Sequence, residues 1–141
     1  MWYYSTMTIT DEMRDKVAEL ARKHGLFLVV LFGSQATGYT HKHSDIDIGY
    51  VSNRDIDYKE NYNVSLELAR VFNHKDVEFT NIYKVSPSMK KQISQTGIPL
   101  YEKDSAVFDY FKIHALREYL DTKPLRIYRD SLVNDFIKTH A

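Results

Sequence analysis

The chain of 141 residues has no cysteine, no long apolar run and no excess of charge of either sign. Without cysteine, a disulfide framework and metal sites built on thiolates are excluded. Nineteen basic residues balance nineteen acidic ones, which disfavours a general nucleic-acid binder because its affinity would rest on many phosphate contacts. The longest apolar run, Leu26–Phe32, is too short to cross a membrane. The N-terminus lacks the basic segment and apolar core of a signal peptide, so we expect a cytoplasmic protein.

What the sequence does contain is typical of one globular domain. Hydrophobic residues make up 43% and charged residues 27% of the chain, and both values lie near the averages of folded proteins. A chain of this length buries a sizeable core without disulfides or structural metal. We therefore expect one domain of the α+β or α/β class, in which residues 1–104 form the core and residues 105–141 form a C-terminal helical extension.

Apolar spacing and capping residues predict the order of helices and strands. Thr10 is a good N-cap, Asp11 and Glu12 follow it at the positive end of a helix dipole, and Gly25 ends that helix. Leu26–Phe32 has the continuous hydrophobicity of a central strand that is buried on both faces. Further strands are expected at 46–51 and 76–83, helices at 58–72, 87–95, 105–121 and 125–140, and a polar connection at 35–44.

One stretch of the chain carries chemical information: Gly33-Ser34, then ten residues, then Asp45 and Asp47. A glycine–serine turn between a strand and a helix lets backbone N–H groups and a hydroxyl approach a phosphate closely. Asp45 and Asp47 are two residues apart on a strand, so their carboxylates project from the same face. Such carboxylates repel each other unless a cation lies between them. Mg²⁺ is the natural candidate, because it prefers oxygen ligands and keeps substrate phosphates in its shell.

Each of these elements also has an ordinary structural explanation. A glycine–serine pair after a strand is usually just a turn, and an Asp-x-Asp sequence is usually solvated. An acidic pair beside the otherwise apolar residues 46–51 is harder to dismiss, because buried charges need partners. The joint occurrence of both motifs between two strands is what indicates a site for phosphate and metal.

The joint pattern resembles the signature of the DNA polymerase beta-like nucleotidyltransferases. Within that superfamily, residues 32–38 (FGSQATG) and 44–48 (SDIDI) are most similar to the minimal nucleotidyltransferases (MNT), the small stand-alone members. The similarity continues around Glu78, over residues 97–102, and over residues 119–125, where antitoxin-type members have a helix break. The resemblance implies an α+β fold with a small mixed β-sheet nucleotidyltransferase core flanked by helices, followed by the C-terminal helical extension.

Taken over residue by residue, the resemblance gives roles to the motif positions. Asp45 and Asp47 would be catalytic metal ligands for magnesium. Gly33 and Ser34 would contact the triphosphate, and Ser44 would be a further nucleotide-binding residue.

Glu78 stands where the family usually has an aspartate. It would serve as the third metal ligand and as a base towards the attacking hydroxyl. Glu is one methylene longer than Asp, which would change the metal geometry or lower the reaction rate. A misplacement of about 1 Å can lower the rate about 100-fold. Asp76, two positions earlier on the same expected strand, is a rival for this role, although Glu78 is favoured.

The resemblance also implies a function and a partner. Antitoxin-type members accompany HEPN-domain toxins, which are ribonucleases, and inactivate them by transferring AMP to a toxin tyrosine. This implies a Mg²⁺-dependent transfer from ATP to a HEPN toxin with two metal ions, without membrane or stable nucleic-acid partners. One alternative, motivated by Glu78, is a non-catalytic antitoxin that neutralises its toxin by complex formation. Another alternative is transfer to a small molecule such as an aminoglycoside. It is weaker, because the enzymes that act on such molecules usually carry a larger second domain.

Other features of the sequence stay open. His41 and His43 flank Lys42 before the acidic motif, but the two further ligands that zinc needs are not identifiable, so a solvated loop is expected. An apolar stripe on the helix at 105–121 is expected to pack in the core, with a partner-binding face as the alternative. The stripe consists of Tyr110, Phe111, Ile113, Leu116, Tyr119 and Leu120. Solvated helix faces are expected for Arg117, Arg126 and Arg129.

Overall fold

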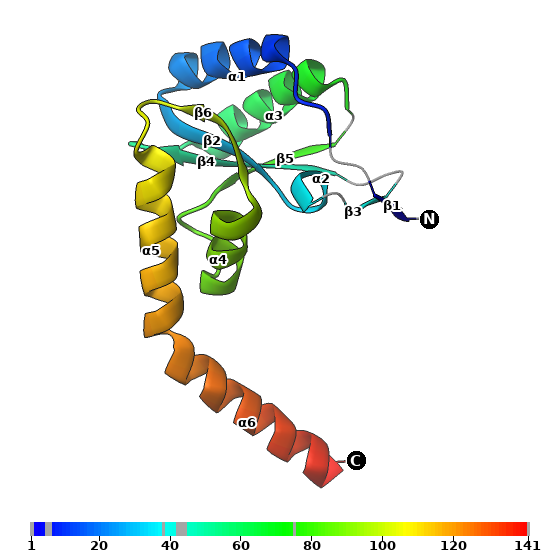
Figure 1. The fold of residues 1–141 in the computed structure, drawn as a ribbon, viewed down its shortest axis with the longest axis vertical. Coiled ribbons are helices and arrows are strands. Elements are labelled where there is room, and N and C mark those ends of the chain that lie inside the picture. The colour runs from blue at the N-terminus through cyan, green and yellow to red at the C-terminus, as the bar shows by residue number, and fades with distance from the viewer. Residues whose placement is uncertain (1, 5–6, 38, 42–44, 75, 141) are drawn as a thin grey trace.

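The computed structural model describes residues 2–4, 7–37, 39–41, 45–74 and 76–140 (Figure 1). Its main sheet has four strands: β2 (Leu26–Phe32), β4 (Ile46–Ser52), β5 (Val77–Asn81) and β6 (Ile98–Glu102). Their order is β5-β4-β2-β6, with β2 antiparallel to both of its neighbours and β4 parallel to β5. The sheet is therefore mixed, as expected, and the predicted central strand is β2.

Helices cover both faces of this sheet, as Figure 1 shows. On one face lie α1 (Asp11–His24) and α3 (Tyr58–Phe72), whose buried side chains include Val17, Leu20, Val64 and Leu68. On the other face lie α4 (Pro87–Thr96) and α5 (Val107–Asp121), which bury Ile93, Phe108, Phe111 and Ala115. The predicted class, a small mixed sheet flanked by helices, is confirmed.

Capping residues explain where α1 and α3 begin and end. The Thr10 side chain accepts a 3.1 Å hydrogen bond from a backbone N–H of the first turn of α1, and Gly25 ends this helix in the left-handed conformation with a φ of 68°. Asp57 caps α3 by accepting from the Glu60 backbone N–H at 2.8 Å. Asn73 ends α3 in the left-handed region, which Asn tolerates better than most side chains.

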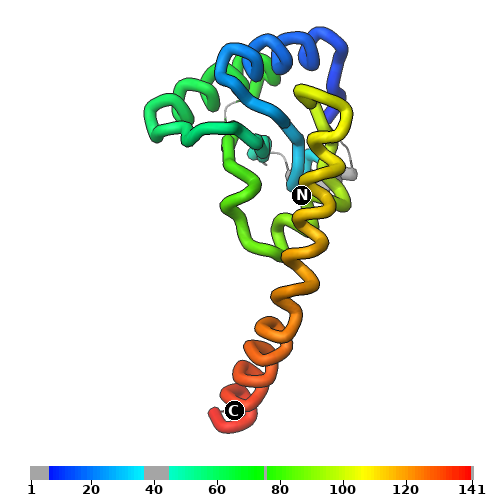
Figure 2. Tube along the Cα trace, turned by 90° about the vertical axis from the view of Figure 1, so that its left-hand side faces the viewer, coloured from blue at the N-terminus to red at the C-terminus, as the bar shows by residue number. Residues whose placement is uncertain are grey.

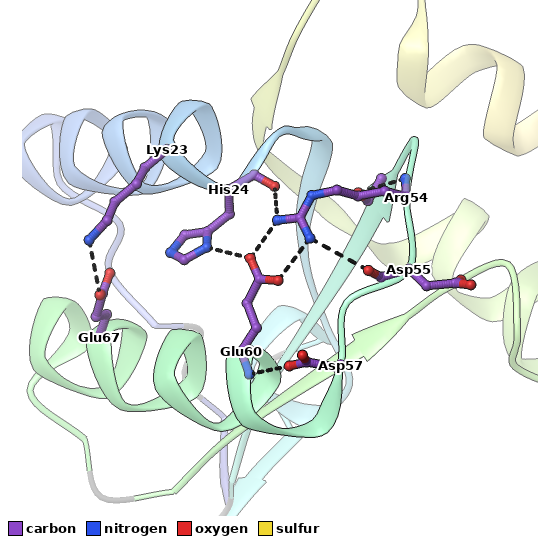
Figure 3. Close-up of polar contacts among 8 residues, drawn as sticks. Lys23, His24, Arg54, Asp55, Asp57, Glu60 and Glu67 are labelled. Carbon is purple, nitrogen blue, oxygen red and sulfur yellow. Dashed lines mark hydrogen bonds and ion pairs between the residues drawn. The ribbon is translucent and has the colours of Figure 1, made fainter.

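A polar cluster fastens the end of α1 to the beginning of α3 (Figure 3). Glu60 on α3 accepts hydrogen bonds from both terminal guanidinium nitrogens of Arg54 and lies 2.8 Å from Nδ1 of His24 on α1. Arg54 also donates to the His24 carbonyl at 3.1 Å. The hydrogen bonds from Arg54 first, and from His24 second, lower the pKa of Glu60 to about 2. The cluster therefore helps to fix the position of α3 relative to α1.

The polar connection predicted at residues 35–44 is wrong in part. The strand β2 leads through Gly33 into the short helix α2 (Ser34–Thr37), and β3 (Tyr39–His41) pairs antiparallel with β1 (Trp2–Tyr4). This pairing joins segments that are distant in sequence, and a local pattern does not reveal it. Lys42, His43 and Ser44, for which sequence expectations were made, lie outside the described residues.

The last helix, α6 (Lys123–His140), extends away from the rest of the protein (Figures 1 and 2). The predicted helix break falls at Thr122, and α6 begins two residues earlier than expected because proline is tolerated in the first turn of a helix. None of the α6 residues that the structure describes is buried. Neither α6 nor any other helix in the described part of the chain is long and apolar enough to span a membrane.

The apolar stripe predicted on α5 is partly buried and partly exposed. Phe111 is fully buried against the sheet, so the expected core packing is correct for this residue. More than half of the side-chain surface stays exposed at Tyr110, Ile113, Leu116 and Leu120. The exposed part of α5 and the whole of α6 thus present apolar residues that this chain does not cover.

Arg126 does not lie on a solvated helix face, contrary to expectation. Its guanidinium carbon is 3.6 Å from the centroid of the Tyr119 ring, and it donates to the Tyr119 carbonyl at 2.7 Å and to Thr122 Oγ1 at 2.6 Å. Lys91 of α4 approaches the same ring at 4.2 Å. Because the arginine bonds to the last turn of α5 from the first turn of α6, it stabilises the junction between the two helices.

Candidate active site

Strand register brings the candidate carboxylates to one end of the sheet. In the parallel pair β4–β5, Asp47 is the direct partner of Glu78, so both side chains project from the same face. In the antiparallel pair β2–β4, Asp47 is the partner of Phe32, the residue before the glycine–serine turn. That face is the one covered by α4 and α5, because Phe32 belongs to their core cluster.

The glycine of the turn lies directly against the Asp47 carboxyl group. Gly33 has a φ of 75°, a left-handed conformation that side chains rarely adopt. A Cβ atom at this position would collide with Oδ2 of Asp47. Glycine is thus required both by the backbone conformation and by the close approach, and the turn faces the acidic residues as the sequence predicted.

Asp47 shows the electrostatic consequence of this arrangement. Burial, the charge of Glu78, a hydrogen bond with the Glu78 side chain and the charge of Asp45 together raise the pKa of Asp47 from 3.8 to about 6. Burial is the largest of these causes. Two carboxyl groups that meet in this way favour either a shared proton or a cation between them.

The other predicted residues are placed as follows. Asp45 is exposed immediately before β4 and acts on Asp47 through its charge. Asp76, the rival of Glu78, is not among the groups that shift the pKa of Asp47. Ser34 opens α2 directly after Gly33.

Mg²⁺ is the cofactor implied by the sequence, and the donor set of Asp47 and Glu78 fits it in chemical type. Both residues offer carboxylate oxygens, which this cation prefers, and it completes its shell with waters and phosphate oxygens. Over the described residues, no group of three or more His, Asp or Glu side chains is close enough to hold a metal ion. The geometry therefore supplies a converging pair, Asp47 with Glu78, and Asp45 as a nearby charge.

Two cavities adjoin this pair, and Glu78 lines both of them. The first, of about 220 Å³, lies between the sheet and α4. It includes Gly33 and Asp47, and its other lining residues include Thr80, Met89, Gln92 and Thr96. The second, of about 550 Å³, lies between β5 and α3 and includes Asp45 and Asp76, with Tyr58, Asn61, Tyr62 and Ser65 from the helix.

Several of these lining residues were missed by sequence reasoning. Thr80 lies two residues after Glu78 on β5, so strand alternation could have placed it on the same face. No sequence signal marked Gln92 on α4 or Tyr62 on α3, because their relation to the site depends on how each helix packs.

The fold and the site together define a protein of the nucleotidyltransferase class: strand carboxylates converge beside a glycine–serine turn, with cavities on both sides. Residues 15–106 match the family "Polymerase beta, Nucleotidyltransferase", and the chain belongs to this family. The family resemblance noted in the sequence is thereby confirmed.

Similar proteins extend the match over most of the chain. It is 26% identical over 130 residues to the protein adenylyltransferase MntA of Shewanella oneidensis, covering 89% of this chain and 92% of that protein. The fold is shared with a crystal structure of a toxin–antitoxin with AMP-PNP, at a TM-score of 0.70 and 24% identity, over 88% of this chain and 98% of the other. It is also shared with a structure of a tri-AMPylated Shewanella oneidensis HEPN toxin in complex with MNT antitoxin, at a TM-score of 0.66 and 21% identity, over 89% and 96% of the two chains.

Proposed function

We propose that this protein is the antitoxin of a HEPN/MNT toxin–antitoxin system and an enzyme that transfers AMP from ATP to a tyrosine hydroxyl of its HEPN ribonuclease toxin. The observation that carries the proposal is the contact of the Asp47 carboxyl group with Glu78 on one side and Gly33 on the other. The family supports nucleotidyl transfer, and the name of the relative MntA supports a protein as acceptor. We also propose that the protein acts in the cytoplasm, as expected from the sequence.

The proposed reaction assigns a task to each group of the site. The triphosphate of ATP lies along the turn of Gly33 and Ser34, with Ser44 as a further contact. The toxin tyrosine oxygen attacks the α-phosphorus, the bond to the β-phosphate bridging oxygen breaks, and pyrophosphate leaves. The tyrosine proton passes to the carboxylate of Glu78. The product is a phosphodiester between tyrosine and AMP.

We further propose that Asp45, Asp47 and Glu78 hold Mg²⁺, with two ions in the complete complex. The bound ions would neutralise the charge that develops on the phosphate oxygens. The raised pKa of Asp47 supports this assignment, because a carboxyl pair without a cation is electrostatically unfavourable. Binding of ATP with Mg²⁺ would relieve that repulsion.

A protein acceptor is favoured over a small molecule by the apolar surface of the C-terminal helices, which we assign to the extension 105–141 of the core 1–104. Monomeric proteins rarely expose contiguous apolar patches larger than a few hundred Å². On α6, helical spacing puts Leu125, Tyr128, Leu132 and Phe136 on one side. These side chains are exposed by 51% to 69%, so we propose that the toxin binds here.

The direct test is to incubate the purified protein with ATP, Mg²⁺ and the toxin encoded by the neighbouring gene. Mass spectrometry should detect the addition of AMP to a toxin tyrosine. Asp45→Asn and Asp47→Asn should abolish the addition, whereas Asp130→Asn, on the exposed surface of α6, should leave it intact. Unmodified toxin in the wild-type reaction would contradict the proposal.

A non-catalytic antitoxin is the second candidate, and the convergence of only two carboxylates among the described residues favours it. In that case a double Asp45→Ala and Asp47→Ala variant would still neutralise the toxin in cells. Loss of neutralisation by this variant, with the complex still formed, supports the enzyme.

A further inference from the structure

The two cavities that meet at Glu78 differ in what else lines them. The smaller one contains Gly33 and Asp47, and so borders the turn where the triphosphate is proposed to lie. The larger one does not include the turn and instead opens between β5 and α3. Its residues include Asp45 and Asp76 from the strand ends and Tyr58 and Tyr62 from the helix.

Transfer of a phosphoryl group in line requires the attacking oxygen and the leaving group to lie on opposite sides of the phosphorus. If the triphosphate follows the turn at Gly33, the attacking hydroxyl approaches from the side away from that turn. The larger cavity includes Glu78 but neither Gly33 nor Asp47, whereas the smaller one includes all three. We propose that this cavity, the α3–β5 groove, binds the tyrosine-bearing segment of the acceptor protein, and that it selects a basic segment. The inference rests on the proposed function and names the acceptor subsite.

A hydrogen bond joins the two walls of the groove, α3 and β5. The Asn61 side chain donates to the Phe79 carbonyl of β5 at 2.9 Å, and Ser65 Oγ donates to the Asn61 carbonyl at 2.9 Å. At this point, α3 is therefore joined to the edge strand of the sheet. Its volume, about 550 Å³, lies within the range of about 300–1,000 Å³ that is common for ligand pockets. A pocket of this size is large enough for a short stretch of polypeptide.

The lining of the groove specifies the chemistry of its occupant. Besides Asp45 and Glu78, which are proposed to hold Mg²⁺, it contains the carboxylate of Asp76, and none of the described residues that line it is basic. Tyr58 is 89% exposed and Tyr62 57% exposed, so their rings offer faces on which a guanidinium or another aromatic ring can stack. The Asp76 carboxylate beside exposed aromatic rings favours a tyrosine flanked by arginine or lysine.

Peptide binding to the full-length protein tests the inference without requiring turnover. The probes are fluorescein-labelled peptides with one tyrosine flanked either by arginines or by glutamates, measured by fluorescence anisotropy with Mg²⁺ and AMP-PNP present, so that the proposed metal ligands are occupied. We expect the arginine-flanked peptide to bind about tenfold more tightly or better. Tyr62→Ala and Asp76→Lys should each weaken it about fivefold or more. The matched control Asp130→Lys, at an exposed position of α6 outside the proposed toxin-binding side, should bind it as the wild type does.

In turnover with Mg²⁺ and ATP, the groove variants should raise the KM for the acceptor and leave the KM for ATP unchanged. Equal binding of both peptides, or wild-type binding by both Tyr62→Ala and Asp76→Lys, would contradict binding of the acceptor in the groove. This outcome is distinguishable from a failure of the proposed function. If the wild type and the two variants modify the toxin equally, only the role of the groove is wrong. If the peptides bind selectively but the toxin is never modified, only the proposed AMP transfer is wrong.

Discussion

Asp47 and Glu78 face each other across the parallel strands β4 and β5, close enough for their side chains to hydrogen bond and for the charge of Glu78 to raise the pKa of Asp47. Gly33 closes the other side of the Asp47 carboxyl group. Without a cation, this pair destabilises the folded protein, because burial and like charge both disfavour ionised Asp47. This relationship leads to predictions for stability as well as for activity.

Asp47→Asn should stabilise the metal-free protein at neutral pH. The pKa of Asp47 is about 6 in the folded protein and 3.8 ordinarily, so the folded state binds a proton that the unfolded chain releases between these values. Stability attributable to Asp47 is therefore highest below pH 4 and falls as the pH rises to about 6. After allowance for solvent screening, we expect a gain of about 1–2 kcal/mol at pH 7.

Urea unfolding of both proteins at pH 4 and pH 7, in the presence of a chelator, measures this effect. The stability difference should be small at pH 4 and large at pH 7. A variant that is less stable than the wild type at pH 7 would show that the ionised Asp47 carboxylate does not destabilise the folded protein.

Gly33→Ala should damage both folding and nucleotide binding. A left-handed conformation costs a non-glycine residue about 1–2 kcal/mol, and the new Cβ would also collide with Asp47. Gly25→Ala is a matched control, because Gly25 has a similar φ of 68° but its nearest atoms lie 3.9 Å or more from a Cβ. Calorimetric titration with AMP-PNP and Mg²⁺ should show loss of binding for Gly33→Ala only. Equal effects of the two changes would mean that the approach to Asp47 has no functional importance.

The sequence predicted the part of the site that is local along the chain. Strand β2 and the turn at Gly33 follow from neighbouring residues, and the structure has them as expected. The common direction of Asp45 and Asp47 stays a prediction, because Asp45 lies immediately before β4 and lines a different cavity from Asp47. Alternation alone could not choose between Asp76 and Glu78, because both project from the same face of a strand. The choice depends on the register with β4, in which Glu78 is the residue opposite Asp47.

Features made by distant segments could not be predicted in this way. The β1–β3 pair joins residues that are far apart in the chain. The walls of the two cavities come from faces of α3 and α4, and nothing in the periodicity of these helices distinguishes a residue such as Tyr62 or Gln92 from other polar surface positions. Arg126 looked like an ordinary surface residue, because its partner Tyr119 lies on the other side of a helix break.

Glu60→Gln should destabilise the protein in a pH-dependent way. The pKa of Glu60 is lowered to about 2 by Arg54 and His24, so its contribution is fully present above its ordinary pKa of 4.5 and is lost as the pH falls towards 2. We expect a loss of about 1 kcal/mol at pH 7 for this partly exposed cluster. Glu67→Gln is the control, since Glu67 has a 3.5 Å ion pair with Lys23 (Figure 3).

Chemical denaturation between pH 3 and pH 7 gives the comparison. The difference between the wild type and Glu60→Gln should shrink towards the acid end, whereas Glu67→Gln should follow the wild type throughout. A constant difference across this range would show that the charge of Glu60 does not contribute.

Phe136→Glu should weaken the complex with the toxin and leave the nucleotide site intact. Phe136 is 62% exposed on the apolar side of α6, and truncating or charging such an anchor in a protein interface costs about 2 kcal/mol or more. Asn134→Glu adds the same charge on the opposite side of the helix and serves as the control. Size-exclusion chromatography of the mixed proteins measures the complex, and AMP-PNP titration checks the nucleotide site. Equal losses for both variants would indicate that charge alone disturbs α6.

Glu78→Gln and Asp76→Asn decide which residue of the strand acts in catalysis. Each change removes a charge at nearly constant shape, at Glu78 within β5 and at Asp76 immediately before it. If Glu78 accepts the tyrosine proton and helps to hold the metal, its amide variant should lower kcat by about 100-fold or more, since general bases contribute about 10²–10⁴-fold. Asp76→Asn should instead raise the KM for the acceptor and change kcat less than about threefold, because Asp76 lines the α3–β5 groove and does not act on Asp47. Steady-state kinetics with the toxin as acceptor separate the two parameters, and the reverse pattern would make Asp76 the catalytic carboxylate.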